Sequence, residues 1–550
     1  VFDRDAMRFV KRGRVNLPGL PRGVRNVAVL PNPGGAITLF LGVGDGKRYR
    51  PREPHWRAPD YDPFDGRGIW RGELPYVGLY AARLSKGLDG RAGKARLVSE
   101  TESEVRFQCG RIAVVDLGEG RERGILTGSR MGPLHYYRNP VASGLELAPK
   151  VHVVDEGGIA LRHPAIHPTP LAYPSPKTGL SALIAGGESA LYWYRFSGRF
   201  SEQGKPIYDA PLPVLEEDAA LYAGSLPVTN CVDWDGDEDT DIVAGNSEGF
   251  ILFFENAGDD AVPRFLPGVR IEADGREIHV QPGYRLDIQG PAEARWGYVC
   301  HTVVDWDRDG LPDIVMSDST ARHTLFLNEG TPTAPKLAHG VPLYYDGLDM
   351  YSMWRVQPAV GLLDGRMAYI TLDKDDELHL YWQVDPRNLT DGGKLRDTRG
   401  KPMRGNCQDA GGTGRLKLVL TDWDGDGIKD LLVGAPPNGS IPAAWVGMPV
   451  VLGSPGAAAL FLRNEGTEAE PAFAYPKMFM HQAEFLYYGR HSCSPSPTRL
   501  GGPGGPHLII GEEGGRLFYY KRNELTFYAP DLASIGGVAR PLLDTVGLGR

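Results

Sequence analysis

Cysteine is scarce in this chain of 550 residues, which contains only five, at widely spaced positions. Cys109, Cys231, Cys300, Cys407 and Cys493 follow no metal-ligand spacing, and their odd number argues against a disulfide framework. We expect buried free thiols on strands. Cys231 and Cys300 lie near the ends of predicted inner strands in neighbouring copies of a repeat that is described below. A disulfide between these two residues is therefore the alternative.

Long apolar runs and clusters of basic residues are also missing. No run approaches the ~20 apolar residues that a membrane helix needs. The net charge is −9, from 60 basic and 69 acidic residues, without the basic stripe of a nucleic-acid-binding protein. No segment has a sustained helical period, whereas 72 glycines and 45 prolines punctuate short apolar runs. The sequence therefore predicts an all-β protein with no membrane span and no nucleic-acid partner.

An Asp-rich motif is what the chain does have, and it occurs three times. The copies begin at Asp233, Asp305 and Asp422, place Asp at positions 1, 3, 5 and 9, and run into a short apolar segment. Carboxylates at this spacing can converge on Ca²⁺, which takes about 6–8 oxygen ligands. A plain Asp/Gly turn that caps backbone amides is the structural alternative. Three copies with one spacing favour calcium, while the apolar twelfth position in each copy excludes an EF-hand.

We predict up to three structural Ca²⁺ ions, with ligands from positions 1, 3, 5, 7 and 9 of each loop. The residues are Asp233, Asp235, Asp237, Asp239 and Asp241 in the first loop, Asp305, Asp307, Asp309, Leu311 and Asp313 in the second, and Asp422, Asp424, Asp426, Ile428 and Asp430 in the third.

These three loops and the strands around them resemble the FG-GAP/VCBS repeat of integrin-type and related secreted β-propellers, although Glu238 and Arg308 stand where the repeat usually has glycine. In that family a strand, the Asp loop and the next strand form the inner part of a blade. The resemblance implies a single seven- or eight-bladed β-propeller over residues 1–550, with all Asp loops on one face.

Weaker copies of the same unit fill the rest of the chain, and each unit with its following hairpin supplies about four strands, as one blade does. We favour eight blades, of which the first is the least regular. The units lie near 24–50, 110–139, 165–196, 226–257, 299–330, 355–385, 416–466 and 493–522. Several separate sandwich domains are the alternative architecture.

A ligand site is expected on the face opposite the Asp loops, where the segments leading into the innermost strands surround the axial opening. These segments are rich in His, Arg, Tyr and Trp, and polar–aromatic clusters are typical of binding sites. Candidate catalytic residues are His301, His167, Tyr298, Arg355 and His491. Candidate substrate-binding residues are His163, Trp296, Trp354, Arg415, Lys417, Arg490 and Tyr488. The structural alternative for each is packing or a hydrogen bond inside the fold, which we assign to His135 and His379.

The resemblance and these residue types favour an extracellular carbohydrate-active enzyme, most specifically a polysaccharide lyase that cleaves a uronic-acid-containing glycan by β-elimination. An Arg would neutralise the uronate carboxylate, a His would take the proton and a Tyr would protonate the leaving oxygen. A glycoside hydrolase, a sugar dehydratase and a non-enzymatic glycan- or protein-binding adhesion propeller are the alternatives. We expect a monomer with an oligosaccharide or polysaccharide partner, secreted or periplasmic after removal of a signal peptide.

Overall fold

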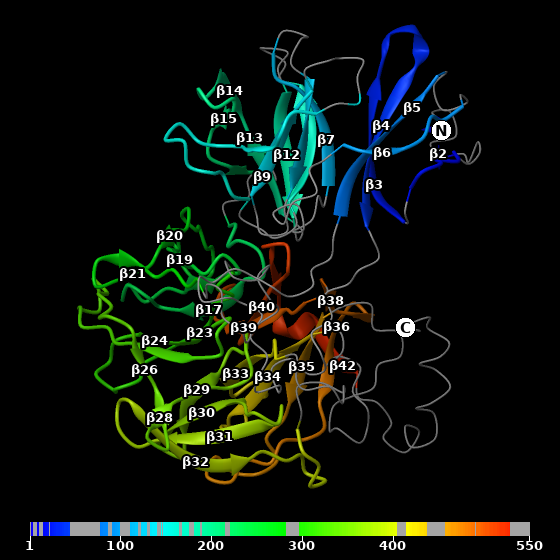
Figure 1. The fold of residues 1–550 in the computed structure, drawn as a ribbon. Helices are drawn as coiled ribbons and strands as arrows, with labels where there is room; N and C mark the ends of the chain where they lie inside the picture. The colour runs from blue at the N-terminus through cyan, green and yellow to red at the C-terminus, as the bar shows by residue number, and fades with distance from the viewer. Residues whose placement is uncertain are drawn as a thin grey trace, which may run out of the picture. The chain divides into compact units, whose positions relative to one another are not determined.

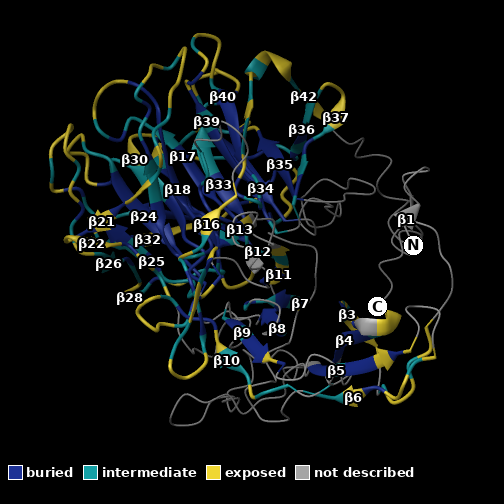
Figure 2. Cartoon of the chain, turned by 90° about the horizontal axis from the view of Figure 1, so that it is seen from above, coloured by how far each residue is buried: buried dark blue, intermediate teal, exposed yellow. Residues whose placement is uncertain are grey.

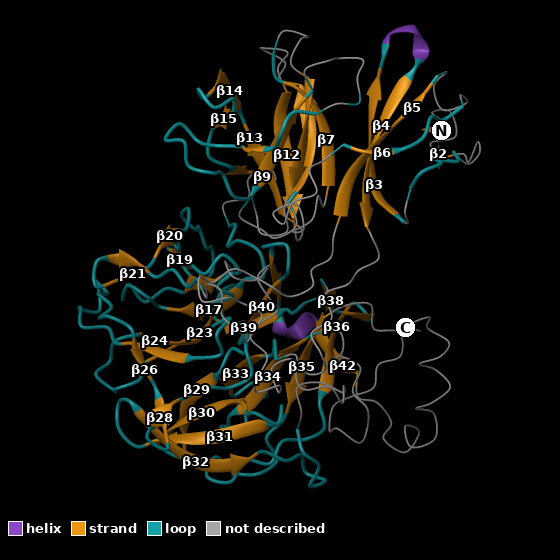
Figure 3. Ribbon diagram, in the orientation of Figure 1, coloured by secondary structure: helices purple, strands orange, loops and turns teal. Residues whose placement is uncertain are grey.

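The structure of the protein, a computed structural model, describes most of the chain. The described residues are 2–3, 8–9, 15–20, 23–44, 77–85, 91–98, 111–118, 123–128, 133–139, 145, 147–163, 168–174, 181–187, 190–214, 221–281, 296–403, 414–436, 457–489 and 491–528. Their regular elements are β-strands with short 3-10 turns at Pro33–Gly35 and Arg522–Glu524 (Figure 3). The all-β prediction is confirmed. Among these residues no helix is long and apolar enough to cross a bilayer.

The predicted apolar segments after the Asp loops form strands that are buried along their whole length. They are β18 (Asp241–Gly245), β24 (Asp313–Ser317) and β34 (Asp430–Ala435). Each is the second strand of its sheet, with a hydrogen-bonded neighbour on both sides. Since both faces are covered, these strands have continuous apolar runs rather than the alternating pattern of a half-exposed strand.

The chain divides into two compact units, Val1–Val214 and Leu215–Arg550. The first unit contains three four-stranded antiparallel sheets, and the first strand of the middle sheet contacts the first strands of the other two. The sheets consist of β3 (Val24–Pro31), β4 (Ile37–Gly44), β5 (Val77–Leu84) and β6 (Arg96–Leu97); β7 (Arg111–Asp116), β8 (Arg123–Gly128), β9 (Leu134–Arg138) and β10 (Val151–His152); and β11 (Thr169–Pro174), β12 (Ser181–Gly187), β13 (Ala190–Tyr194) and β16 (Leu212–Pro213). Two-stranded pairs join β1 (Phe2–Asp3) to β2 (Arg8–Phe9) and β14 (Phe196–Phe200) to β15 (Pro206–Tyr208).

Within the described residues, the second unit contains a two-stranded hairpin and five larger sheets, each of which includes an antiparallel run of three strands. Sheet A has β17 (Val228–Val232), β18, β19 (Ile251–Phe254) and β20 (Val269–Arg270), followed by the hairpin of β21 (Glu272–Ala273) and β22 (Arg276–Glu277). Sheet B has β23 (Cys300–Val304), β24, β25 (His323–Phe326) and β26 (Val341–Pro342). Sheet C has β29 (Ala359–Leu363), β30 (Arg366–Leu372), β31 (Leu378–Gln383) and β32 (Asn388–Lys394), extended by β27 (Tyr344–Tyr345) and β28 (Leu348–Asp349).

The last two sheets of this unit are D and E, and the C-terminal strand of the described residues belongs to sheet D. Sheet D has β33 (Lys417–Thr421), β34, β35 (Ala457–Leu462), β36 (Lys477–His481), β37 (Glu484–Phe485) and β38 (Tyr487–Tyr488). Sheet E has three strands, β39 (Ser494–Thr498), β40 (His507–Gly511) and β41 (Leu517–Tyr520). The final strand β42 (Leu525–Tyr528) returns to pair with β36 of sheet D (Figure 1).

The five sheets of the second unit close into a ring. Their first strands contact one another in the order β17, β23, β29, β33 and β39, and β39 contacts β17 again. At this last junction the Thr229 amide donates to the Ser494 hydroxyl at 3.1 Å, and the Cys231 amide donates to the Ser496 hydroxyl at 3.1 Å. The ring is therefore complete within residues 221–528.

An apolar cluster fills each junction between neighbouring sheets of the ring. Trp234 lies in the cluster between sheets A and B, Trp306 in that between B and C, and Trp423 in that between D and E. Separate clusters join C to D and E to A. Figure 2 shows the inner strands as buried and the outer loops as exposed. The tryptophan at position 2 of each Asp motif thus serves packing between sheets.

The closure with five sheets corrects the expectation of one ring of seven or eight blades. Of the eight units inferred from the sequence, five form the ring and three form the sheets of the first unit. The physical reason is that β39 already packs on β17, which leaves no open junction in the ring for another sheet. The described residues therefore form a ring of five sheets and not the single ring of seven or eight blades that we expected.

Closure within one part of the chain leads to the first prediction. A fragment of residues 215–550 is expected to unfold cooperatively in urea, with a near-ultraviolet circular dichroism signal from its packed tryptophans. A matched fragment of residues 215–490, which lacks sheet E, is expected to lose that signal because two junctions of the ring would be exposed. Equal stability of the two fragments would contradict the closure.

Candidate functional site

The three Asp loops gather carboxylates at one end of the ring, just after the first strands of sheets A, B and D. Within the described residues, positions 1, 3 and 9 of each loop bring ligand atoms within 4.8 Å of one another. The groups are Asp233, Asp235 and Asp241; Asp305, Asp307 and Asp313; and Asp422, Asp424 and Asp430. Three converging carboxylates on a tight loop have the donor chemistry that Ca²⁺ requires.

The ninth Asp of each loop is buried and holds the loop in place. Asp241 accepts hydrogen bonds from the backbone amides of Trp234 at 3.0 Å and Asn256 at 2.8 Å. Asp313 and Asp430 accept the corresponding pairs of amides in their own sheets. Burial raises the pKa of all three carboxyls to about 6, against the opposing effect of these hydrogen bonds. A bound cation would offset the cost of burying such a charge.

Positions 5 and 7 of the loops behave differently from the prediction. Asp237, Asp309 and Asp426 are not in the converging groups found among the described residues. Each instead accepts a hydrogen bond from the backbone amide of position 7, which is Asp239, Leu311 or Ile428. The fifth Asp therefore shapes the turn, as the structural alternative predicted, and the three carboxylates at positions 1, 3 and 9 are the core of each candidate metal site.

The opposite end of the ring, called the rim here, contains strained backbone. Leu226, Tyr298, Arg355 and Arg415 precede the first strands of sheets A to D and have φ of 54°, 46°, 58° and 70°. A left-handed conformation costs a non-glycine residue about 1–3 kcal/mol and is enriched at functional sites. A five-residue first strand separates the rim from the Asp loops by roughly 16 Å. The Asp loops and the rim residues thus lie at opposite ends of these first strands.

Five residues gather at the rim in what we call the rim cluster: Tyr298, Trp354, Arg355, Arg415 and Lys417. The Arg355 guanidinium carbon lies 3.1 Å from the centre of the Tyr298 ring and 4.2 Å from that of Trp354. The Arg415 guanidinium carbon lies 5.3 Å from the centre of the Trp354 ring. Trp354 and Arg415 are partly exposed, whereas the other three are buried. All five residues are candidates predicted from the sequence.

Lys417 is a buried member of the rim cluster whose ammonium group bonds to the backbone of two other members. Its Nζ donates to the backbone carbonyls of Arg355 at 2.9 Å and Arg415 at 3.2 Å. Burial lowers the pKa of Lys417, and the charges of Arg355 and Arg415 act in the same direction, against the opposing effect of the Cys300 thiol. Three cationic groups packed this closely would be stabilised by an anionic ligand.

His301, predicted as a catalytic base, lies inside the ring. It is fully buried on β23. Its Nε2 is 3.1 Å from the Asn230 amide nitrogen, which also donates to the His301 carbonyl at 3.0 Å. Burial lowers the pKa of His301 to about 3. Its neutral imidazole therefore links sheets A and B, and its position does not support a role in proton transfer.

Among the candidate bases, His491 lies at the rim with a partly exposed side chain. Its Nδ1 lies 3.0 Å from Oε1 of Glu513, and its backbone amide donates to Oε2 of the same carboxylate at 3.0 Å. Glu513 is buried, and its carbonyl accepts the Leu226 amide across the junction of sheets E and A. A carboxylate that orients a partly exposed imidazole is an arrangement suited to general base catalysis.

Two other candidates serve packing. Tyr488 is buried between sheets D and E, where its hydroxyl donates to the Tyr520 hydroxyl at 2.8 Å, and burial raises its pKa. Trp296 is buried as well. Neither presents a ring on which a sugar could stack.

The remaining candidates lie elsewhere. His163 belongs to the first unit, where its Nδ1 is 2.7 Å from the Tyr194 hydroxyl and burial lowers its pKa to about 3. His167 and Arg490 lie outside the described residues. Cys231, Cys300 and Cys493 are free thiols, as expected, while Cys109 and Cys407 lie outside the described residues.

Sequence reasoning missed Glu513 and the thiols around Lys417. Glu513 is the second residue after the predicted strand His507–Gly511, so its place on the same end of the ring as His491 could have been inferred. Cys300 and Cys493 both interact electrostatically with Lys417. Nothing in their spacing indicates that contact, which arises from the ring itself.

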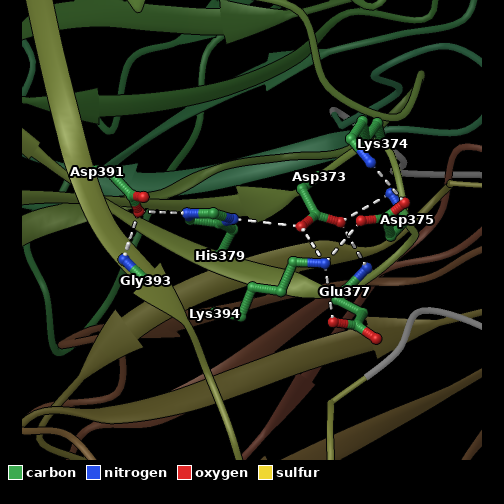
Figure 4. A network of polar contacts seen from close by, with 8 residues as sticks. All are labelled: Asp373, Lys374, Asp375, Glu377, His379, Asp391, Gly393 and Lys394. Carbon is green, nitrogen blue, oxygen red and sulfur yellow. Dashed lines mark hydrogen bonds and ion pairs between the residues drawn. The ribbon is translucent and has the colours of Figure 1, made fainter.

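A separate polar network occupies sheet C (Figure 4). The Lys394 ammonium lies 3.1, 2.7 and 3.0 Å from carboxylate oxygens of Asp373, Asp375 and Glu377. His379 bridges Asp373 at 3.2 Å and Asp391 at 2.8 Å. The network satisfies its own charges, so it supports the structural role that we assigned to His379 from the sequence.

Comparison with known proteins identifies no family: no protein-family model and no curated protein matches the chain. Among solved structures, a lectin from Burkholderia pseudomallei is 11% identical with a TM-score of 0.31, over 77% of this chain and 99% of that one. The NanB sialidase from Streptococcus pneumoniae is 8% identical with a TM-score of 0.27, over 96% and 73%. An Agrocybe aegerita lectin is 14% identical with a TM-score of 0.24, over 74% and 91%. Similarities this low carry no argument about fold or activity.

The sheet C network predicts a pH-dependent contribution to stability. Burial lowers the pKa of His379, but hydrogen bonds to Asp373 and Asp391 outweigh this effect and hold the pKa above its usual value. The stabilisation is therefore complete below the unfolded pKa of about 6.5 and declines as pH rises through the folded pKa. His379→Gln should lower Tm by roughly 2–4 °C at about pH 5.5, and by less at about pH 9. His339→Gln, at an exposed site, is the control; an equal loss at both pH values would contradict the assignment.

Proposed function

We propose that residues 215–528 form a five-bladed β-propeller that binds an acidic carbohydrate at the rim. The observation that carries this proposal is the rim cluster, in which two guanidinium groups and one ammonium group lie beside two aromatic rings. Guanidinium groups bind carboxylates through paired hydrogen bonds. A glycan that contains uronic acid offers such carboxylates on a chain of hydroxyls.

Arg415 is the residue most suited to meet a ligand, because its side chain is partly exposed beside the partly exposed Trp354. Trp354 contacts both guanidinium groups. Its role is therefore to orient Arg355 and Arg415, rather than to act as a free stacking platform for a sugar. The buried Arg355 and Lys417 would supply a positive field behind the contact.

We also propose that the Asp loops hold up to three structural Ca²⁺ ions through positions 1, 3 and 9. The buried, unpartnered Oδ1 atoms of Asp235 and Asp305 fit this role, because each lacks a hydrogen-bond donor at its loop. The ions would stiffen one end of the ring and take no part in chemistry at the other. A secreted or periplasmic location, where calcium is plentiful, would suit such loops.

Elimination by a polysaccharide lyase is the second candidate function, and the pair of His491 and Glu513 favours it. His491 would take the proton next to a uronate carboxylate that Arg415 or Arg355 neutralises, and this replaces the role first assigned to His301. A glycoside hydrolase would instead need two carboxyl groups on either side of the scissile bond. A sugar dehydratase would use the same proton transfer as the lyase, and an adhesion propeller would bind without turnover.

Binding at the rim can be tested with Arg415→Gln. Loss of one charge-assisted contact of about 1.5–3 kcal/mol should weaken binding of a uronate oligosaccharide roughly 10–100-fold by calorimetry. Added salt should weaken the wild-type binding, because the attraction is electrostatic. Arg276→Gln, on the exposed hairpin of β21 and β22, is the control. Equal affinity for a neutral oligosaccharide, or no effect of Arg415→Gln, would exclude the proposal.

Turnover can be tested by incubation with a panel of uronate polysaccharides, following the ultraviolet band of an unsaturated uronate. A lyase should produce this band, and His491→Gln should slow it by roughly 10²–10⁴-fold with little change in binding. His339→Gln serves as the control. Sugar release without the band would favour hydrolysis, and binding without turnover would favour the adhesion module.

A further inference from the structure

The three Asp loops share a motif, but their sheets differ in the residue that directly follows the third strand. The comparison is fixed by Asn256, Asn328 and Asn464, whose amides all bond to the ninth Asp of their loop. The residues directly before these asparagines are Glu255, Leu327 and Arg463. This position is thus acidic in the first copy of the repeat, neutral in the second and basic in the third.

The third loop already contains a cation of its own. The Arg463 Nε lies 2.7 Å from Oδ2 of Asp424, and a terminal nitrogen of Arg463 lies 2.8 Å from Oδ2 of Asp426. Asp424 is one of the three carboxylates that converge in this loop. A metal ion that uses this oxygen must therefore displace a guanidinium group, and the two positive charges would repel each other.

The first loop has the opposite character. The charge of Glu255 acts on Asp235, a member of the converging group. Asp239 adds a further carboxyl that is only 9% exposed, with an Oδ1 atom that has no hydrogen-bond partner. Asp239 is surrounded by the charges of Asp237, Asp241 and Asp260. This loop therefore gathers the most negative charge, together with a buried oxygen that lacks a donor.

The second loop lies between these extremes. Leu327 places no charge beside it. Arg308 at position 4 points away from the carboxylates, because its guanidinium donates to the Gly365 carbonyl at 2.8 Å. The second loop thus retains three converging carboxylates with neither an added acid nor an added base.

The first loop also lies at the junction where sheet E closes the ring onto sheet A. Arg499 of sheet E donates to the Glu238 carbonyl at 3.2 Å and lies 3.3 Å from Oδ2 of Asp260. The other oxygen of Asp260 accepts the Thr240 amide at 2.9 Å. An ion in this loop would therefore order the segment to which the last sheet is attached.

We propose that the residue before each asparagine sets the Ca²⁺ affinity of its loop, so that the three loops are graded. The loop next to Glu255 binds Ca²⁺ most tightly and stabilises the closure of the ring, whereas the guanidinium of Arg463 neutralises the third loop. The inference rests on the proposed role of the loops in calcium binding. Its physical basis is that calcium affinity rises with the number of charged ligands. It is independent of any carbohydrate at the rim.

Terbium luminescence tests the grading on the full chain, because Trp234, Trp306 and Trp423 stand at position 2 of the loops and can sensitise bound Tb³⁺. Wild-type protein should show one tight site that Asp235→Asn removes and Asp424→Asn leaves in place. Glu255→Gln should weaken the tight site about tenfold or more, since it removes one full charge. Arg463→Leu, which copies the second loop, should tighten the third site by a similar factor.

Controls separate these effects from general changes of charge. Glu329→Gln makes the same change one residue after Asn328, and Arg276→Leu removes an exposed arginine; neither should alter any site more than about twofold, since screened surface charges act weakly. Three sites of equal affinity, or an Arg463→Leu variant with an unchanged third site, would overturn the grading. Absence of any Tb³⁺ or Ca²⁺ binding would overturn it together with the proposed calcium role.

Hydrogen exchange tests the link to ring closure. Calcium should slow exchange of the Thr229 and Cys231 amides, which bond to Ser494 and Ser496 across the closing junction. It should have less effect on the Leu418 amide, which donates to the Gln357 carbonyl across the junction of sheets C and D. Glu255→Gln should abolish the difference at matched calcium. Uniform protection of all junctions would contradict the proposal that Ca²⁺ in the first loop stabilises the closing junction.

Discussion

A buried carboxylate at the end of each Asp loop is the contact on which this end of the ring depends. Asp241, Asp313 and Asp430 each begin the second strand of a sheet and bond to backbone amides from the loop before it and from the end of the third strand. One side chain thereby fixes the loop, the register and the tryptophan that fills the next junction. The repeated spacing in the sequence follows from this geometry, since a shift of one residue would break the hydrogen bonds and misplace the tryptophan.

Structural features that lie within a single repeat could be predicted from the sequence. The strands after the Asp loops, the Asp-Gly turn at Asp274 and Gly275, and the opposite placement of the Asp loops and the rim all follow from short-range patterns. Where the ring closes does not, because that depends on β39 meeting β17 across 265 residues of the chain. The repeats look alike whether they belong to one ring or to two units. The count of units could therefore be predicted, but the number in the ring could not.

The candidate site shows the same division. Tyr298, Arg355 and Arg415 were predicted because their positions before the first strands direct them to one end of the ring. His301 was misassigned because a strand alternates its faces, and only the neighbouring sheet reveals that its imidazole is covered by Asn230. Residue type and chain position thus indicated the correct end of the ring, while burial decided which groups are available to a ligand.

The two ends of the ring therefore have distinct chemistry, acidic and suited to metal ions at one, cationic and aromatic at the other. The most direct test is a crystal structure of the full chain grown with Ca²⁺ and an acidic oligosaccharide. The account predicts an ion among Asp233, Asp235 and Asp241, and a sugar carboxylate against Arg415 at the opposite end. A sugar bound among the Asp loops, or a ring that includes the sheets of the first unit, would contradict it.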